Sequence, residues 1–475
     1  MRDFAAVTLL SILPTLAFAQ TMPATMPAAP AAVSADSSAD PDTARLYQQV
    51  RKSLVAVQYT WESELGRHEV IGAGIVVRDD GLVMAPMAVF DVRIPDEQMK
   101  AFKILVPSDR GDAEEIDAKF LGRDERSDVA FLQATGKHSW QSLHFATRDL
   151  QIGQPLWSIG VLPKLAGYKA YIVQGTVAAN LRGEMPQILI SGPLAGVGSP
   201  VVDSSGVAVG MVPFQTEQPL LLNDRKAGLS MISRPPVYFV SADAVLGSIT
   251  DPPAGQPLKL PWIGVMQLIG LKKEVADYFG LADRPAIQIG DIIPGAPAEQ
   301  AGLTPGSIIT QIDGKPLVRG DEVEELPMIL RRQLLQMKVG TKVVFTVLDP
   351  RTRKSRDITI TLNERPKPAN LAERFFAEDL GFGVREMVFM DTYMRHLAAN
   401  SPGVVVSVIR PQSAAQTARL ESNDLVVELN GKAMTVTKQF TQDYRDFRKL
   451  RPREAVVLVV LREGRNQTIR IEPPQ

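Results

Sequence analysis

The sequence predicts a mostly β protein with several domains, and three observations lead to this prediction. Short apolar runs separated by glycine, aspartate and proline turns fill residues 54–249, as in a β-barrel or a β-sandwich. An internal repeat follows a proline-rich segment at residues 251–253. The chain has 475 residues, more than one hydrophobic core usually spans, so we expect two to four domains.

The composition excludes several function classes. Hydrophobic residues make up 45% and charged residues 22%, and the formal net charge is −1, so no charge imbalance indicates a nucleic acid or an anionic membrane as partner. Cysteine is absent, which excludes disulfides, thiolate zinc sites and cysteine nucleophiles. The sequence shows neither a histidine or acidic cluster at metal-ligand spacing nor a phosphate-binding glycine loop, so we expect no cofactor.

The first residues predict an exported protein. Residues 1–19 combine Arg2, a short apolar run and an Ala17-Phe18-Ala19 cleavage pattern, as secretory signal peptides do. An uncleaved anchor is the alternative, but the apolar run is shorter than the ~20 residues that a membrane-spanning helix needs. Residues 20–43 are rich in Ala, Pro and Ser without apolar periodicity, which predicts a flexible linker. We therefore expect a soluble protein of the periplasm or another exported compartment.

Three segments within residues 44–250 carry candidate chemistry. The first runs from Gly72 to Val89, the second holds Asp128 in a Ser-Asp-Val-Ala run, and the third runs from Gly192 to Gly210. They resemble the segments that carry His, Asp and Ser in the HtrA/Deg family of trypsin-like serine proteases. The resemblance implies a trypsin-like domain of two six-stranded β-barrels, with the cleft between them.

Two of the three positions that the resemblance assigns to the catalytic triad hold unsuitable residues. The family's His falls at Ala88, its Asp at Asp128 and its Ser at Val197. A serine hydroxyl needs a neighbouring imidazole to take its proton, and the aspartate only orients that imidazole. Ala88 has no proton acceptor and Val197 has no hydroxyl, so we expect a protease with a degenerate triad. Asp128 is expected to accept hydrogen bonds from backbone amides of its turn.

An active protease with a relocated nucleophile is the alternative. Ser199 lies two residues beyond the nucleophile position, but no histidine of the chain (His68, His138, His144 or His396) stands where the base belongs. By resemblance, the backbone amides of Ala195 and Val197 would form the oxyanion hole. Ala195 and the Ser199-Pro200 step lack the backbone freedom of the family's glycine-rich run, so we expect a collapsed hole.

The internal repeat predicts two copies of one small domain. Residues 287–298 recur as 404–415, and residues 306–315 recur as 423–432, with one offset and no gap. Each copy has the pattern strand, proline-containing turn, short Ala-rich helix, strand and Asx-Gly turn. The copies resemble the PDZ domain in the permuted form of bacterial HtrA proteins. This resemblance implies three parts: domain one at 258–365, a linker at 366–378 and domain two at 379–475.

The resemblance also implies a peptide-binding loop in each domain. A PDZ domain adds an extended peptide as a strand and holds its terminal carboxylate on loop amides. The loop of the first domain is Trp262-Ile263-Gly264-Val265, and that of the second is Gly381-Phe382-Gly383-Val384. The opposite wall of each groove is expected to be a helix, at residues 322–336 and 437–450.

The two grooves are not expected to be equivalent. Pro261 and Trp262 crowd the first loop, and Pro327 would kink or restart the first groove helix. The second domain is therefore expected to be the better peptide binder.

Taken with the degenerate triad, the resemblance predicts a proteolytically inactive HtrA-like protein. It would bind peptide segments or C-termini of envelope proteins, as a chaperone, an adaptor or a regulator of an active HtrA-like paralogue in protein quality control. HtrA-type proteins assemble as trimers, so a homo-oligomer is expected. A structural scaffold without peptide affinity is the second alternative.

Overall fold

The computed structural model describes residues 41–108, 112–181, 187–213, 237–281, 284–320, 323–398 and 400–474. The signal peptide expected at residues 1–19 and most of the linker expected at 20–43 lie outside these residues. Among the helices that are described, none is both long enough and apolar enough to span a membrane.

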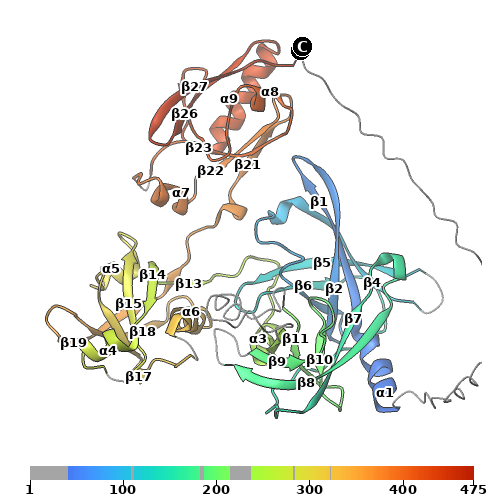
Figure 1. The fold of residues 1–475 in the computed structure, drawn as a ribbon. Helices are drawn as coiled ribbons and strands as arrows, with labels where there is room; N and C mark the ends of the chain where they lie inside the picture. Colours follow the sequence, from blue (N-terminus) through green and yellow to red (C-terminus); the bar gives the residue numbers. More distant parts are fainter. Residues whose placement is uncertain are drawn as a thin grey trace, which may run out of the picture. The chain divides into compact units, whose positions relative to one another are not determined.

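The protease-like region consists of two closed six-stranded barrels, which confirms the predicted double barrel (Figure 1). It begins with helix α1 (Pro41–Val50) and ends with helix α3 (Asp243–Thr250). The first barrel closes in the order β1-β2-β3-β6-β5-β4 and the second in the order β10-β11-β12-β9-β8-β7. The strands of the first barrel are β1 (Leu54–Ser63), β2 (Gly66–Arg78), β3 (Leu82–Pro86), β4 (Met99–Val106), β5 (Glu114–Asp124) and β6 (Val129–Ala134). Those of the second are β7 (Pro155–Val161), β8 (Ala170–Leu181), β9 (Gln187–Ser191), β10 (Pro200–Val202), β11 (Ala208–Met211) and β12 (Val237–Ser241).

One apolar cluster joins the two barrels. It includes Met84 and Phe131 of the first barrel and Trp157 of the second. Helix α1 adds Leu46 and Val50, which are four residues apart and so lie on one face of the helix. Each barrel has an additional cluster of its own. The loops at the junction are therefore attached to a packed scaffold.

The first repeat domain, residues 258–365, is a small sheet with three α-helices among its described residues. Its sheet runs β14-β15-β16-β18-β19, with β17 paired to β16, and a separate two-stranded ribbon joins β13 to β20. The strands are β13 (Pro261–Trp262), β14 (Val265–Gly270), β15 (Ile287–Ile292), β16 (Ile308–Ile312), β17 (Lys315–Pro316), β18 (Lys342–Leu348), β19 (Ser355–Thr361) and β20 (Asn363–Glu364). The helices are α4 (Lys273–Tyr278), α5 (Pro297–Gln300) and α6 (Leu326–Leu335).

The second repeat domain, residues 366–475, repeats this plan with one more strand at the edge. Its sheet runs β21-β22-β23-β24-β26-β27, with β25 paired to β24. The strands are β21 (Arg374–Ala377), β22 (Phe382–Glu386), β23 (Val404–Ile409), β24 (Leu425–Leu429), β25 (Lys432–Ala433), β26 (Val456–Arg462) and β27 (Arg465–Ile471). The helices are α7 (Phe389–Met394), α8 (Ala414–Thr417) and α9 (Thr437–Leu450).

One segment departs from the expected domain boundaries. Residues 366–378 were expected to be a linker, but the structure places Arg374–Ala377 in the sheet as β21. The physical reason is that aromatic side chains favour a pleated, half-buried surface, and Phe375 and Phe376 find one beside β22.

Candidate functional site

Ala88 lies in the turn that follows β3. The amide of Val89 donates to the carbonyl of Pro86 at 3.0 Å, and the amide of Phe90 donates to that of Met87 at 2.9 Å. This helical turn leaves the Ala88 side chain exposed. A methyl group at this place offers no proton acceptor.

The turn with Ala88 meets the turn with Asp128. The amide of Met87 donates to the carbonyl of Asp128 at 3.0 Å. Asp128 has a φ of 56°, in the left-handed region, which aspartate tolerates better than most residues. Its side chain is exposed, yet surrounding protein atoms remove part of its solvation, and this raises the pKa of the carboxyl group.

The expected role of Asp128 in its turn is wrong, because Asp124 performs it. Asp124 is fully buried and its Oδ1 accepts the amide of Arg126 at 3.0 Å, while Oδ2 accepts the Arg126 guanidinium at 2.6 Å and the Ser248 hydroxyl at 2.7 Å. In the part of the chain that the structure describes, no hydrogen bond reaches the carboxylate of Asp128.

The loop with Val197 packs against the end of β3. Gly198 has a φ of 82°, and a Cβ added to it would lie 2.7 Å from Cδ of Pro86. Only glycine fits such a close approach at a positive φ. The structure therefore brings the loops of Ala88, Asp128 and Val197 together, although two of these side chains are apolar.

Two backbone amides of the Val197 loop are engaged by side chains that the sequence did not single out. The amide of Ala195 donates to Oγ of Ser158 at 3.2 Å, and the amide of Gly196 donates to the Tyr171 hydroxyl at 2.8 Å. Ser158 is on β7 and Tyr171 is on β8, so both acceptors come from strands that precede the loop by more than 20 residues. No short motif could have indicated them.

Ser199 begins the return into the second barrel. Its side chain is 2% exposed, and its hydroxyl has no hydrogen-bond partner among the described residues. Its amide closes a turn on the carbonyl of Gly196 at 3.0 Å, and its carbonyl accepts the amide of Val212 at 2.9 Å. A buried hydroxyl without an adjacent base is poorly placed to attack a substrate.

The four histidines lie elsewhere. The ring of His68 is 5.6 Å from that of Trp61, and Nδ1 of His138 is 3.4 Å from a carboxylate oxygen of Glu114. His144 and His396 are exposed. Within the described ranges, no hydrogen bond or ion pair joins a histidine to Asp128 or Ser199.

Tyr238 is a further residue near Asp128 that sequence reasoning missed. It is buried on β12, and burial together with the negative charge of Asp128 raises the pKa of its hydroxyl. The two residues are 110 positions apart, so only the closed barrels bring them close.

The first repeat domain contains an open groove beside an unpaired strand edge. β14 is the outermost strand of its sheet, and a groove of about 410 Å³ separates it from α6. Met266 of β14 and Met328 of α6 line this groove and are 43% and 40% exposed. Pro327 lies in the first turn of α6, where no helical hydrogen bond is lost, so the helix starts there rather than being kinked.

The loop at the end of this groove has the geometry that a close backbone approach requires. Gly264 has a φ of 81°, and a Cβ added to it would lie 2.0 Å from that of Ala296. The carbonyls of Ile263 and Gly264 accept the amides of Ala298 and Ile293 at 2.9 and 2.8 Å. Trp262 and Val265 line the groove on either side of Gly264. The four residues predicted for the first loop are thus adjacent to one groove.

The equivalent loop of the second repeat domain does not lead to a free edge. Gly381 precedes β22, and Phe382, Gly383 and Val384 lie within it, paired in antiparallel register with β21. Phe382 and Val384 are fully buried. The second domain was expected to be the better peptide binder, but its strand β22 is already paired with β21. The strand with an unpaired edge is β14, in the first domain.

Comparisons with known proteins agree with this architecture. Residues 72–211 match the family model of the trypsin-like peptidase domain, and residues 288–348 match that of the PDZ domain. A probable periplasmic serine endoprotease DegP-like of Pseudomonas fluorescens is 26% identical over 405 residues, covering 83% of this chain and 77% of its own length. A protein of the same description from Ectopseudomonas mendocina is 27% identical over 410 residues, covering 83% and 78%.

Solved structures show the same fold. The HtrA-type protease AlgW with decapeptide superposes with a TM-score of 0.51 at 18% sequence identity, covering 68% of this chain and 99% of that one. AlgW with tripeptide gives a TM-score of 0.50 at the same identity, covering 68% and 98%.

Proposed function

Because the chain is homologous to proteins of the DegP/HtrA family, combining a trypsin-like peptidase domain with a PDZ domain, we propose that it is an exported, proteolytically inactive peptide-binding protein. The observation that carries this proposal is the open groove between β14 and α6, beside an unpaired strand edge. The proposed ligands are peptide segments or C-termini of envelope proteins. The protein would act on them as a chaperone or an adaptor, or it would regulate an active HtrA-like paralogue.

The empty triad positions support the absence of proteolysis. Ala88 cannot take a proton and Val197 cannot attack a carbonyl, while the hydroxyl of Ser199 is buried away from any described base. Proteases stripped of their triad keep a residual acceleration of about 10³–10⁴-fold, which comes from the oxyanion hole and substrate binding. Here the Ala195 amide, one of the two expected donors, already donates to Ser158. The residual catalysis that an oxyanion hole could provide is therefore weakened as well.

The groove of the first repeat domain supports peptide capture. An extended peptide can add to the free edge of β14 through main-chain hydrogen bonds, and alternate side chains then enter the apolar groove. The loop of Ile263 and Gly264 lies where a terminal carboxylate would meet backbone amides. The two AlgW structures, one with a decapeptide and one with a tripeptide, are consistent with this use of the fold.

Proteolysis is tested with unfolded casein and a fluorophosphonate probe on the purified mature chain. We expect neither peptide release nor labelling above that of a Ser199→Ala variant. Cleavage or labelling that Ser199→Ala abolishes would show an active protease with a relocated nucleophile and overturn the proposal.

Peptide binding is tested with fluorescent peptides of free, apolar C-termini, followed by anisotropy. Met266→Glu should weaken binding at least ~tenfold, because it replaces an apolar contact surface of the groove by a carboxylate that a bound peptide would have to desolvate. Ile269→Glu is the matched control: Ile269 is on the same strand and also 43% exposed, but it does not line the groove. Equal effects of the two variants, or no binding by the unmodified chain, would contradict capture in this groove.

A further inference from the structure

The second repeat domain has a strand where a peptide ligand would lie. In the first repeat domain, the strand that follows the loop, β14, has a free edge facing α6. The corresponding strand β22 is covered on that edge by β21, and α9 lies against both strands. From this arrangement, we propose that residues 374–377 are the resident ligand of the second groove, which is thereby closed to external peptides.

The direction of β21 is that of a bound peptide. β21 runs antiparallel to β22, with Arg374 opposite Arg385 and Ala377 opposite Phe382. A C-terminal peptide on this strand would also run antiparallel and place its last residue beside the loop. Ala377 occupies that last position, and the chain then turns back through residues 378–381.

The side chains of β21 alternate as those of a groove ligand should. The ring of Phe375 lies 5.4 Å from that of Tyr444 and 6.1 Å from that of Phe440, both on α9. Ala377 is two residues further, on the same face of the strand, and is 1% exposed. Phe376 points to the other face, where the guanidinium of Arg410 lies 4.8 Å from its ring. One aromatic and one small side chain therefore fill the groove.

A carboxylate follows directly after this strand. The Tyr444 hydroxyl donates to Oδ1 of Asp379 at 2.6 Å, and Arg448 Nε lies 2.6 Å from Oδ2. Burial and the hydrogen bond to Asp379 raise the pKa of Tyr444, so the hydroxyl remains a donor. α9 thus binds a side-chain carboxylate of the chain itself near the end of the groove.

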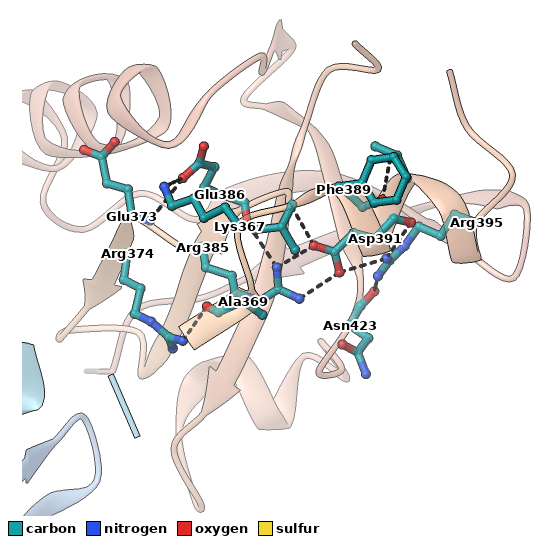
Figure 2. Close-up of polar contacts among 12 residues, drawn as sticks. Lys367, Ala369, Glu373, Arg374, Arg385, Glu386, Phe389, Asp391, Arg395 and Asn423 are labelled. Carbon is teal, nitrogen blue, oxygen red and sulfur yellow. Dashed lines mark hydrogen bonds and ion pairs between the residues drawn. The ribbon is translucent and has the colours of Figure 1, made fainter. Parts of the chain in front are cut away.

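Polar contacts fasten the segment that leads into β21 (Figure 2). Lys367 pairs with Glu386 at 2.6 Å, and the amide of Glu386 donates to the carbonyl of Glu373 at 2.8 Å. The Arg374 guanidinium donates to the carbonyl of Ala369 at 3.0 Å. An external peptide would have to displace these contacts as well as the strand, so its apparent affinity is reduced by the small fraction of open grooves.

The occupant of each groove is read out by photo-crosslinking on the full chain. The probe is a peptide with the sequence of residues 370–377, with benzoylphenylalanine in place of Phe375 and a free C-terminus. Mass spectrometry then distinguishes labelling of α6, in the first groove, from labelling of α9, in the second. We expect the unmodified chain to be labelled on α6 but not on α9. Phe375→Ala should raise α9 labelling about tenfold, because two aromatic contacts of the resident strand are lost.

The matched control is Phe376→Ala, which removes an equal ring from the other face of β21 and should leave α9 labelling low. Labelling of α9 in the unmodified chain as strong as that of α6 would overturn the proposal, as would equal effects of the two variants. If α9 is labelled as expected but α6 is not labelled at all, the result would count against peptide capture in the first groove and would leave the proposal for the second groove intact.

A second measurement needs no variant. The amide of Glu386 donates to the carbonyl of Glu373, next to β21, so its exchange reports whether this strand stays in place. In NMR hydrogen exchange on the unmodified chain, it should be as well protected as the amides that form hydrogen bonds between β26 and β27. Free exchange of the Glu386 amide would show that β21 does not remain in the groove, and would overturn the proposal even if Phe375→Ala failed to fold.

Discussion

The amide of Met87 donates to the carbonyl of Asp128 at 3.0 Å, and this hydrogen bond joins the two turns to which the family resemblance assigns the base and the acid of a catalytic triad. The loop of Val197 completes the arrangement by packing Gly198 against Pro86. The backbone thus keeps the relation between three loops although Ala88 and Val197 supply no reactive group.

This relation predicts the behaviour of an imidazole restored at position 88. In Ala88→His, the pKa of the introduced imidazole should rise above its ordinary value of about 6.5, because the nearby Asp128 charge favours the imidazolium. The added stability should be present below the ordinary pKa and be lost as the pH rises through the folded-state pKa. NMR titration of the ring measures this. In an Asp128→Asn background the rise should disappear, and a rise that persists there would have another cause.

Asp128 itself should lower stability at neutral pH. Its pKa is raised in the folded state, so the charged carboxylate is less favourable there than in the unfolded chain. The free energy of unfolding should therefore fall as the pH rises from the unfolded-state pKa through the folded one. Asp128→Asn should be more stable than the unmodified chain at pH 7 and equally stable below about pH 3.5, by thermal unfolding across pH. If Asp128→Asn is instead less stable than the unmodified chain at pH 7, the Asp128 carboxylate must have a stabilising partner.

Two buried serines of the second barrel should differ in their contribution to stability. Ser158→Ala leaves the Ala195 amide without its acceptor and should cost about 1–3 kcal/mol. Ser199→Ala removes a hydroxyl for which the described residues offer no partner, so its cost should be near zero. Urea unfolding, followed by the intrinsic tryptophan fluorescence of the chain, compares the two. Equal costs would mean that the Ser158 bond is absent or that Ser199 has a partner.

The buried pair of Arg385 and Asp391 should be essential to the second repeat domain. The two groups share bonds of 2.6 and 2.8 Å and are both 8% exposed, so Asp391→Asn should cost about 3–5 kcal/mol by leaving Arg385 uncompensated. Burial alone would raise the pKa of Asp391, but the hydrogen bonds from Arg385 and the Val388 amide lower it. The stabilisation should therefore be present above the ordinary pKa and be lost as the pH falls through the folded-state pKa.

Calorimetry of the full chain across pH provides the measurement, and Glu454→Gln provides the control. Glu454 pairs with Arg451 at 3.2 Å, but both side chains are 59% exposed, so the loss of this pair should cost about 0–1 kcal/mol. An Asp391→Asn variant no less stable than Glu454→Gln would contradict the role assigned to the buried pair.

The strand pattern predicted a β-barrel or a β-sandwich and the repeat predicted two copies of one domain, because both signals extend over many residues, whereas the division into two barrels came from the family resemblance. The sequence could not distinguish Asp124 from Asp128, which lie four positions apart in one turn and differ only in how the closed barrel surrounds them. The acceptors Ser158 and Tyr171 were hidden for the same reason, since their contacts to the Val197 loop exist only in the folded barrel.

β21 was missed because four residues carry almost no periodicity. The Arg-Phe-Phe-Ala segment follows two prolines, at positions 366 and 368, and this composition is typical of linkers. Its strand conformation depends on β22 and on the rings of α9, which are contributed by residues up to 69 positions later in the chain. The difference between an open and a filled groove is therefore a tertiary property.

Helix α1 constrains the order in which the protease-like region can fold. The indole nitrogen of Trp157 donates to Oγ1 of Thr43 at 3.0 Å, across 114 residues. A chain that emerges N-terminus first has α1 available early, but the helix cannot dock until the second barrel has begun to form. Closing so long a loop is slow, so the shared core of the barrels should be among the last parts to become protected during synthesis. Until then Leu46 and Val50 remain exposed to solvent, so α1 needs protection from aggregation until the second barrel forms.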